Sequence, residues 1–403
     1  MSKMRPTPLR FVRSLARMLG LAGRCRAGLP EALKASPWLT RVWQGLAPQT
    51  TWDCHAHLAG LGDAADSGIQ VASRLSSPLH PMLYAQYLSY INAACLEDFL
   101  GPTDENYVQR LLGQMADMPS GVKLVLLAFD HFHDDSGQPQ PEASTFYVPD
   151  AYACKLARTY PQFFEWAASI HPYRPDAVDR LEAAAKEGAR AVKWLPAAQN
   201  IDPADVRCAA FYAALARLDL PLVIHCGKEQ AVHNDKLHYG NPLLLRSALE
   251  IGARVVVAHC ASSGDDADLD HGGRIRKSSF HLFSRLMEEA AWKGRLFGDI
   301  SAVTLRNRKP EIIKTLLQRK DWHERLLNGS DYPLPGILPI VSLDALTRAG
   351  LLPREAVPDL KILREYNPLY FDLAVKRHLN WQGAYFSPQI FATRSFFTNR
   401  RGD

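Results

Sequence analysis

The sequence predicts an α/β protein of the (β/α)8 barrel class, with an N-terminal helical extension and a helical insertion after the first strand. From residue 122 onward, short aliphatic and β-branched runs alternate with longer helical patterns, which is typical of parallel βα units. Counting the strand within "TWDCHAH", eight buried-strand candidates occur with seven crossovers between them, as expected of such a barrel. An open doubly wound sheet is disfavoured because neither GxGxxG nor GxxxxGK[ST] occurs.

The strand candidates are short apolar runs separated by amphipathic patterns. After the first strand, at 51–57, they lie at 121–129, 163–173, 189–196, 220–227, 253–262, 294–302 and 324–336. Helices are predicted between them at about 176–187, 205–218, 242–250, 279–291 and 311–320.

The chain divides into three predicted parts. Residues 49–375 form the barrel domain, residues 1–48 a basic helical extension, and residues 376–403 a C-terminal tail. Residues 58–120 are too long for a simple connection and contain the helical pattern "ENYVQRLLGQMADM". We therefore expect a capping insertion between the first two strands.

Composition is that of a globular protein with a large core, because 47% of the residues are hydrophobic and 22% are charged. The net charge of +5 is small and dispersed, so we expect no nucleic-acid partner. No apolar run is long enough for a membrane-spanning helix. The seven cysteines form no CxxC pair and do not resemble a disulfide framework, which favours a reducing compartment and a cytoplasmic location.

The N-terminus has the pattern of a basic amphipathic helix. Four arginines, Arg10, Arg13, Arg17 and Arg24, share one face, and no acidic residue precedes Glu31. Such a helix packs on the protein body or a partner, rests on an anionic membrane surface, or acts as a targeting segment. Peripheral membrane contact through residues 1–30 and homo-oligomer formation are both open from the sequence.

Polar side chains follow several strands at the end where barrel active sites are built. They are His55, His57, Lys193, His225, His259 and Asp331. Burying four imidazoles and a carboxylate at one end of an apolar barrel is costly unless a divalent cation compensates them. The nitrogen and oxygen donors favour zinc first, with manganese, iron or cobalt as alternatives.

Three cysteines next to candidate ligands, and one aspartate, are predicted to have structural roles. Cys54, Cys226 and Cys260 each adjoin a candidate ligand, and strand alternation predicts that they face the surrounding helices. Asp299 is interpreted as structural, with orientation of a ligand histidine as the alternative.

Five stretches resemble signature motifs of the amidohydrolase superfamily, in particular its amidohydrolase-related metal-dependent hydrolases, over about residues 50–372. They are "DCHAH", "VIHCG", "VAHCASSG", "LLNGSDYP" and "YNPLYF". The resemblance implies that His55, His57, His225, His259 and Asp331 bind one or two divalent ions. It also implies that Lys193 corresponds to a lysine carried as a metal-bridging carbamate in binuclear members.

The predicted function is therefore hydrolysis of a small amide, ester or lactone by metal-activated water, with Asp331 as the proton acceptor. Candidate substrate-binding residues, which would give the pocket a positive lining suited to a carboxylate, are His131, His133, Lys228, His233, His238 and Arg306. One alternative is a mononuclear decarboxylase of the same superfamily. Another is a membrane-associated or scaffolding barrel without turnover, whose basic N-terminus and aromatic C-terminal tail make the contacts.

Overall fold

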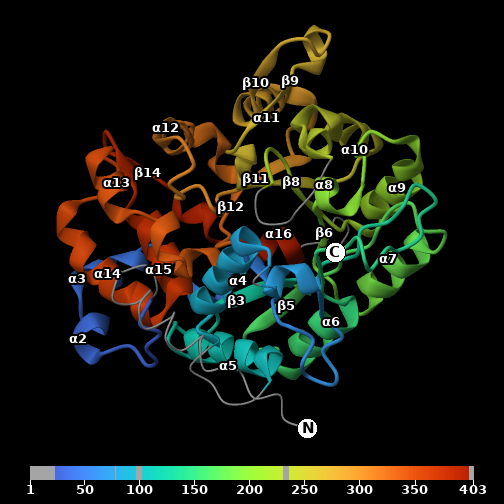
Figure 1. Cartoon of the computed structure of the whole chain (residues 1–403). Helices are drawn as coiled ribbons and strands as arrows, with labels where there is room; N and C mark the ends of the chain where they lie inside the picture. Colours follow the sequence, from blue (N-terminus) through green and yellow to red (C-terminus); the bar gives the residue numbers. More distant parts are fainter. Residues whose placement is uncertain (1–22, 78, 97–101, 230–235, 399–403) are drawn as a thin grey trace.

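Eight parallel strands surround the centre of the molecule in the computed structural model, which describes residues 23–77, 79–96, 102–229 and 236–398 (Figure 1). One sheet contains β1 (Trp52–His57), β3 (Lys123–Leu127) and β5 (Phe164–Ala167). The other contains, in chain order, β6 (Val192–Trp194), β7 (Leu222–His225), β8 (Val255–Ala258), β11 (Leu296–Asp299) and β12 (Leu326–Leu327).

Isolated parallel bridges join these two sheets at both edges. Ala168 pairs with Val192 on one side, and Ala56 pairs with Tyr332 on the other. The strands therefore follow one another in chain order around the core, and the predicted (β/α)8 TIM-barrel fold is confirmed.

Amphipathic helices cover the strands. They are α6 (Asp150–Thr159), α7 (Ala177–Lys186), α9 (Ala209–Leu218), α10 (Arg246–Ile251), α11 (Ser279–Glu288), α12 (Pro310–Gln318), α14 (Val357–Tyr366) and α15 (Pro368–His378). Several are shorter than predicted because 3-10 turns replace their ends. Residues 206–208 form such a turn where the Asp205 side chain accepts a hydrogen bond from the backbone N–H of Arg207.

The insertion after β1 contains β2 (Gln70–Val71), α4 (Pro81–Ala93) and α5 (Thr103–Ala116). β2 pairs with β4 (Phe146–Tyr147), a short strand beyond β3. The buried carboxylate of Asp104 accepts hydrogen bonds from the backbone N–H groups of Leu61 and Gly62, which fixes the loop that leaves β1. In Figure 1, α4 crosses the middle of the view, over the strands.

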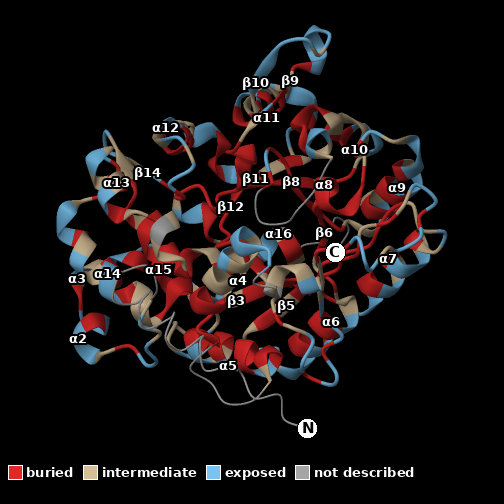
Figure 2. Ribbon diagram, in the orientation of Figure 1, coloured by how far each residue is buried: buried red, intermediate tan, exposed pale blue. Residues whose placement is uncertain are grey.

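A small apolar cluster fills the barrel interior, and a larger one separates the strands from the helices. Buried residues predominate along the strands, and exposed ones gather at the periphery (Figure 2). Cys226 and Cys260 lie in the larger cluster, as expected. Cys54 packs in the interior cluster instead, so its predicted outward orientation is wrong. The physical reason is that the pairing of β1 with β3 shifts register between Asp53 and Ala56, which breaks the strict alternation.

The C-terminal tail lies against the N-terminal end of the barrel. Thr393 Oγ1 donates to the carbonyl of Trp52 at 2.6 Å, and Phe397 of α16 (Arg394–Thr398) stacks on the Trp52 ring within the interior cluster. Phe386 and Phe391 are also buried. The aromatic tail is thus part of the fold, which corrects the interpretation that it makes contacts with a partner.

Before β1, the described residues form two short helices, α2 (Glu31–Lys34) and α3 (Pro37–Val42). Most of the predicted basic helix lies outside the described residues. Cys25 forms a disulfide with Cys95, which follows α4. The sequence does not predict this pair, because 70 residues separate the two cysteines and no spacing motif connects them. Among the described helices, none is long and apolar enough to cross a membrane.

Candidate metal centre

The candidate ligands are presented by the carboxyl ends of β1, β6, β7, β8 and β12. His55 and His57 belong to β1, and Lys193 and His225 to β6 and β7. His259 and Asp331 follow β8 and β12 with positive φ angles of 55° and 60°. Such backbone is uncommon outside glycine, and it is held here by the surrounding strands.

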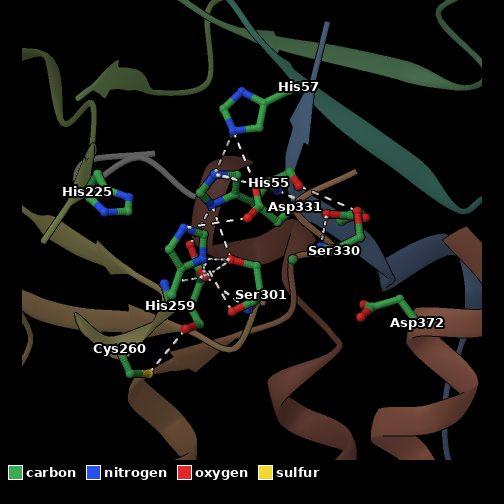
Figure 3. Close-up of polar contacts among 12 residues, drawn as sticks. His55, His57, His225, His259, Cys260, Ser301, Ser330, Asp331 and Asp372 are labelled. Carbon is green, nitrogen blue, oxygen red and sulfur yellow. Dashed lines mark hydrogen bonds and ion pairs between the residues drawn. The ribbon is translucent and has the colours of Figure 1, made fainter. Parts of the chain in front are cut away.

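Three of these residues converge tightly. Single donor atoms of His55, His259 and Asp331 all lie within 4.8 Å of one another (Figure 3). Asp331 Oδ1 is 3.6 Å from His55 Nε2 and 3.2 Å from His57 Nε2, and Asp331 Oδ2 is 3.7 Å from His259 Nε2. The ring of His225 lies with its centroid 5.2 Å from that of His259.

Other side chains contact the Nδ1 atoms of the histidine rings, on the side away from Asp331. Asp299 Oδ2 lies 2.8 Å from His55 Nδ1, and Asp299 Oδ1 accepts from the backbone N–H of His259 at 2.9 Å. Ser301 Oγ lies 2.7 Å from His259 Nδ1, and Glu229 Oε2 lies 3.3 Å from His225 Nδ1. With Nδ1 engaged, the Nε2 atom of each ring is the one left for a ligand.

The carboxylate of Asp53 ties the first and last strands together. Its Oδ1 accepts from the backbone N–H of His55 at 3.0 Å and from that of Ser330 at 2.9 Å. Because His55 and Asp331 sit on these two segments, this clamp fixes their separation.

Electrostatics keep the donors in the forms that bind metal. Burial lowers the pKa of His55 to about 4 and that of His259 well below its usual value, so both rings are neutral. Burial alone would raise the pKa of Asp331, but His259, His57 and His55 together hold it well below its usual range. Neutral imidazoles and an ionised carboxylate are the donor set that a divalent ion requires.

Two further observations bear on the fit of a metal. His225 Nε2 is buried and has no hydrogen-bond partner among the described residues, which fits a role as a metal ligand. Lys193 Nζ lies 3.1 Å from His55 Nε2, and burial lowers the pKa of this amine. The nitrogen and oxygen donors therefore fit a divalent transition metal.

A cavity of about 420 Å³ opens above these residues. His57, Lys193, His225, His259 and Asp331 line it. Of the predicted substrate-binding residues, Lys228 lines this cavity, and His233 lies outside the described residues. Glu229 and Arg308 also line it. Arg308 follows the seventh strand, where the sequence places positive residues at the pocket mouth, whereas Glu229 is not predicted although it follows His225 by four positions.

The remaining predicted substrate-binding residues do not line this cavity. His131 stacks on Tyr147 with ring centroids 3.8 Å apart, and His133 stacks on His171 at 4.2 Å. Both rings are therefore occupied by packing beside the barrel mouth. His238 and Arg306 are exposed, and His238 packs on the Tyr239 ring.

Residues 52–336 match the model of a protein family described as amidohydrolase. The chain belongs to this family. It is an enzyme of the amidohydrolase superfamily, as the motifs around His55, His225, His259 and Asp331 predict. No curated protein matches the sequence.

Several solved structures resemble this amidohydrolase. An uncharacterised TIM-barrel protein of Bordetella bronchiseptica is 14% identical, with 78% of this chain and 99% of that chain covered and a TM-score of 0.47. A zinc-bound amidohydrolase of Burkholderia multivorans is 13% identical, with 74% and 89% covered and a TM-score of 0.41. The 5-carboxyvanillate decarboxylase of Sphingomonas paucimobilis is 12% identical, with 78% and 98% covered and a TM-score of 0.42. At these values, none of the three indicates the reaction of this chain.

Proposed function

We propose that this amidohydrolase is a metal-dependent hydrolase of a small, carboxylate-bearing amide, ester or lactone. The convergence of His55, His259 and Asp331 on one point, with His57 and His225 beside it, is the observation that carries the proposal. These five residues would hold the metal, for which zinc fits the donors best.

The metal, when bound, supplies Lewis-acid polarisation of the substrate carbonyl and lowers the pKa of a water molecule. The protein supplies the proton transfers. Asp331 Oδ1 lies within 3.2 Å of His57 Nε2 and at the cavity surface, so it can accept a proton from water there and pass it to the leaving group. Asp299 and Ser301 keep the rings of His55 and His259 oriented while the charge on Asp331 changes.

The chemical state of Lys193 distinguishes a site with one metal ion from a site with two. An ammonium beside divalent ions is disfavoured, so this buried lysine must be neutral or carboxylated if two ions are present. We propose the carbamate, which would place two oxygens toward the centre. Its test is metal stoichiometry at saturating metal and bicarbonate, together with the activity of Lys193→Ala with and without added short carboxylic acids. Two metals per wild-type chain and partial rescue of the variant by the acids support the carbamate, and one metal per chain without rescue overturns it.

A mononuclear decarboxylase is the second candidate. It is favoured by the tight cluster, because the donors of three residues within 4.8 Å match one ion. In that case Lys193 would contact the substrate or serve the structure.

A direct assay separates the two reactions. The metal-loaded protein is screened against carboxylate-bearing esters, lactones and amides, and separately against aromatic carboxylic acids with detection of released carbon dioxide. Hydrolysis that disappears in Asp331→Asn supports the proposal, whereas carbon dioxide release without hydrolysis overturns it in favour of the decarboxylase.

Membrane contact through residues 1–30 is a separate proposal that rests on the arginines of the N-terminal segment. Removal of residues 1–22 should leave turnover unchanged and weaken binding to anionic vesicles. Unchanged vesicle binding would overturn it.

A further inference from the structure

The cavity above the candidate metal centre has a polar floor and an apolar wall. The floor contains the candidate ligands, and most of the wall comes from the insertion after β1 and from the segment after β12. Wall side chains include Val71, Leu75, Tyr87, Ile91, Phe146 and Leu334. Hydrolysis at the floor does not require an apolar wall. The wall therefore indicates that the part of the substrate away from the reacting bond is apolar.

Arg308 lines this cavity and has guanidinium donors that no described residue satisfies. Its Nε and Nη1 atoms are buried and have no hydrogen-bond partner among the described residues. Burial lowers the pKa of this guanidinium, and the charges of Asp331 and Glu229 oppose that shift. A guanidinium remains charged in such a setting.

Neither nearby carboxylate satisfies the Arg308 donors. Asp331 faces His57 and His259, and Glu229 lies 3.3 Å from His225 Nδ1. Arg308 is half-buried, and its two buried donors are costly to fold because they have lost water and gained no acceptor among the described residues. The cost is recovered when a bound ligand brings an acceptor with negative charge.

We propose that the cavity binds an amphipathic carboxylate, whose acid group pairs with Arg308 and whose aryl or alkyl group packs on the wall formed by α4 and its neighbours. This deepens the proposed function, on which it rests. The cavity volume of about 420 Å³ is in the range of pockets that enclose molecules of this size.

Isothermal titration of the metal-loaded protein tests this assignment with three probes: 4-phenylbutyrate, the matched alcohol 4-phenylbutanol, and butyrate. We expect 4-phenylbutyrate to bind at least about tenfold more tightly than either of the others, because only it engages both the cation and the wall.

Two variants separate the acid and apolar contributions. Arg308→Met should remove the preference for acid over alcohol, and its Tm should not fall, because two buried donors without described partners have been removed. Lys309→Met, an exposed neighbour with the same charge change, is the control and should keep the preference. Leu75→Asn should weaken 4-phenylbutyrate several-fold and leave butyrate unchanged.

Equal acid preference in Arg308→Met and Lys309→Met would overturn the proposal, as would binding of 4-phenylbutyrate no tighter than butyrate. Failure of the hydrolase function is distinguishable from either result. If the probe binds as expected but no ester, lactone or amide is hydrolysed, the reaction is wrong and the assignment of the cavity stands.

Discussion

Two groups of histidines follow strands of the same barrel, and they differ in what their ring nitrogens meet. His55, His225 and His259 have Nδ1 beside Asp299, Glu229 and Ser301, respectively. The Nε2 atoms of His55 and His259 face Asp331, and that of His225 lacks a described partner. This group is poised for an ion.

The second group, His131, His133 and His171, is occupied by the protein itself. His131 Nδ1 lies 3.1 Å from Ser144 Oγ, and His133 Nδ1 donates to the carbonyl of His131 at 3.0 Å. His171 Nε2 donates to the carbonyl of Gln199 at 2.9 Å, while its Nδ1 accepts from the backbone N–H of Tyr173. A position after a strand therefore does not identify a ligand. The candidate ligands differ in having Nδ1 beside another polar side chain and Nε2 either facing Asp331 or without a described partner.

The largest effect is expected from Asp331→Asn. Loss of the proton acceptor should lower kcat/KM by about 10²- to 10⁴-fold, while the remaining oxygen and the histidines keep most of the metal. Steady-state kinetics with elemental analysis of the same sample checks this. The exposed Asp344→Asn is the control. Undiminished turnover would remove Asp331 from the chemistry.

Asp299→Asn should act through the metal. Because Asp299 orients His55 and the backbone of His259, its loss should weaken metal affinity by about 10- to 100-fold. Competition with a chelator of known affinity measures the change. Ser144→Ala, which removes contacts with the packed His131 and with the backbone of Phe132 and Gln140, is the matched control and should leave the affinity unchanged. Equal affinities in both variants would mean that Asp299 serves the fold alone.

His171→Gln should alter the pH dependence of stability and leave metal content unchanged. Burial lowers the pKa of His171 to about 3, from about 6.5 in the unfolded chain. The unfolded state therefore takes up a proton first, and the fold loses up to ~1.4 kcal/mol per pH unit as the pH falls through this window.

Urea unfolding of metal-free wild type and His171→Gln at pH 7.5 and pH 5 compares these losses. The variant should lose less stability between the two values, because it lacks this proton uptake. An identical loss in the two proteins would contradict the neutral, packed state of His171.

The smallest effect is expected from His131→Asn. Its ring stacks on Tyr147 and contacts Ser144, so its loss should cost about 1 kcal/mol of unfolding free energy and leave metal stoichiometry unchanged. A loss of metal in this variant would erase the distinction between the two groups.

The ends of the strands could be predicted from the sequence, because apolar runs mark the strands and barrel active sites lie at their carboxyl ends. These two facts were enough to place His55, His259 and Asp331 on one face of the barrel. Contacts between distant segments could not be predicted from the sequence. The register shift that turns Cys54 inward, the disulfide of Cys25 with Cys95, and the unsatisfied donors of Arg308 depend on tertiary packing. Stacking likewise separates His131 and His133 from the cavity, although their sequence positions resemble those of ligands.

Elemental analysis of the purified protein after metal-supplemented expression tests the central claim most directly. The account predicts at least one transition-metal equivalent per chain in the wild type, with loss of most of it in His55→Ala and retention in His171→Gln. Metal at less than about a tenth of an equivalent in the wild type, or equal metal in the two variants, would contradict it.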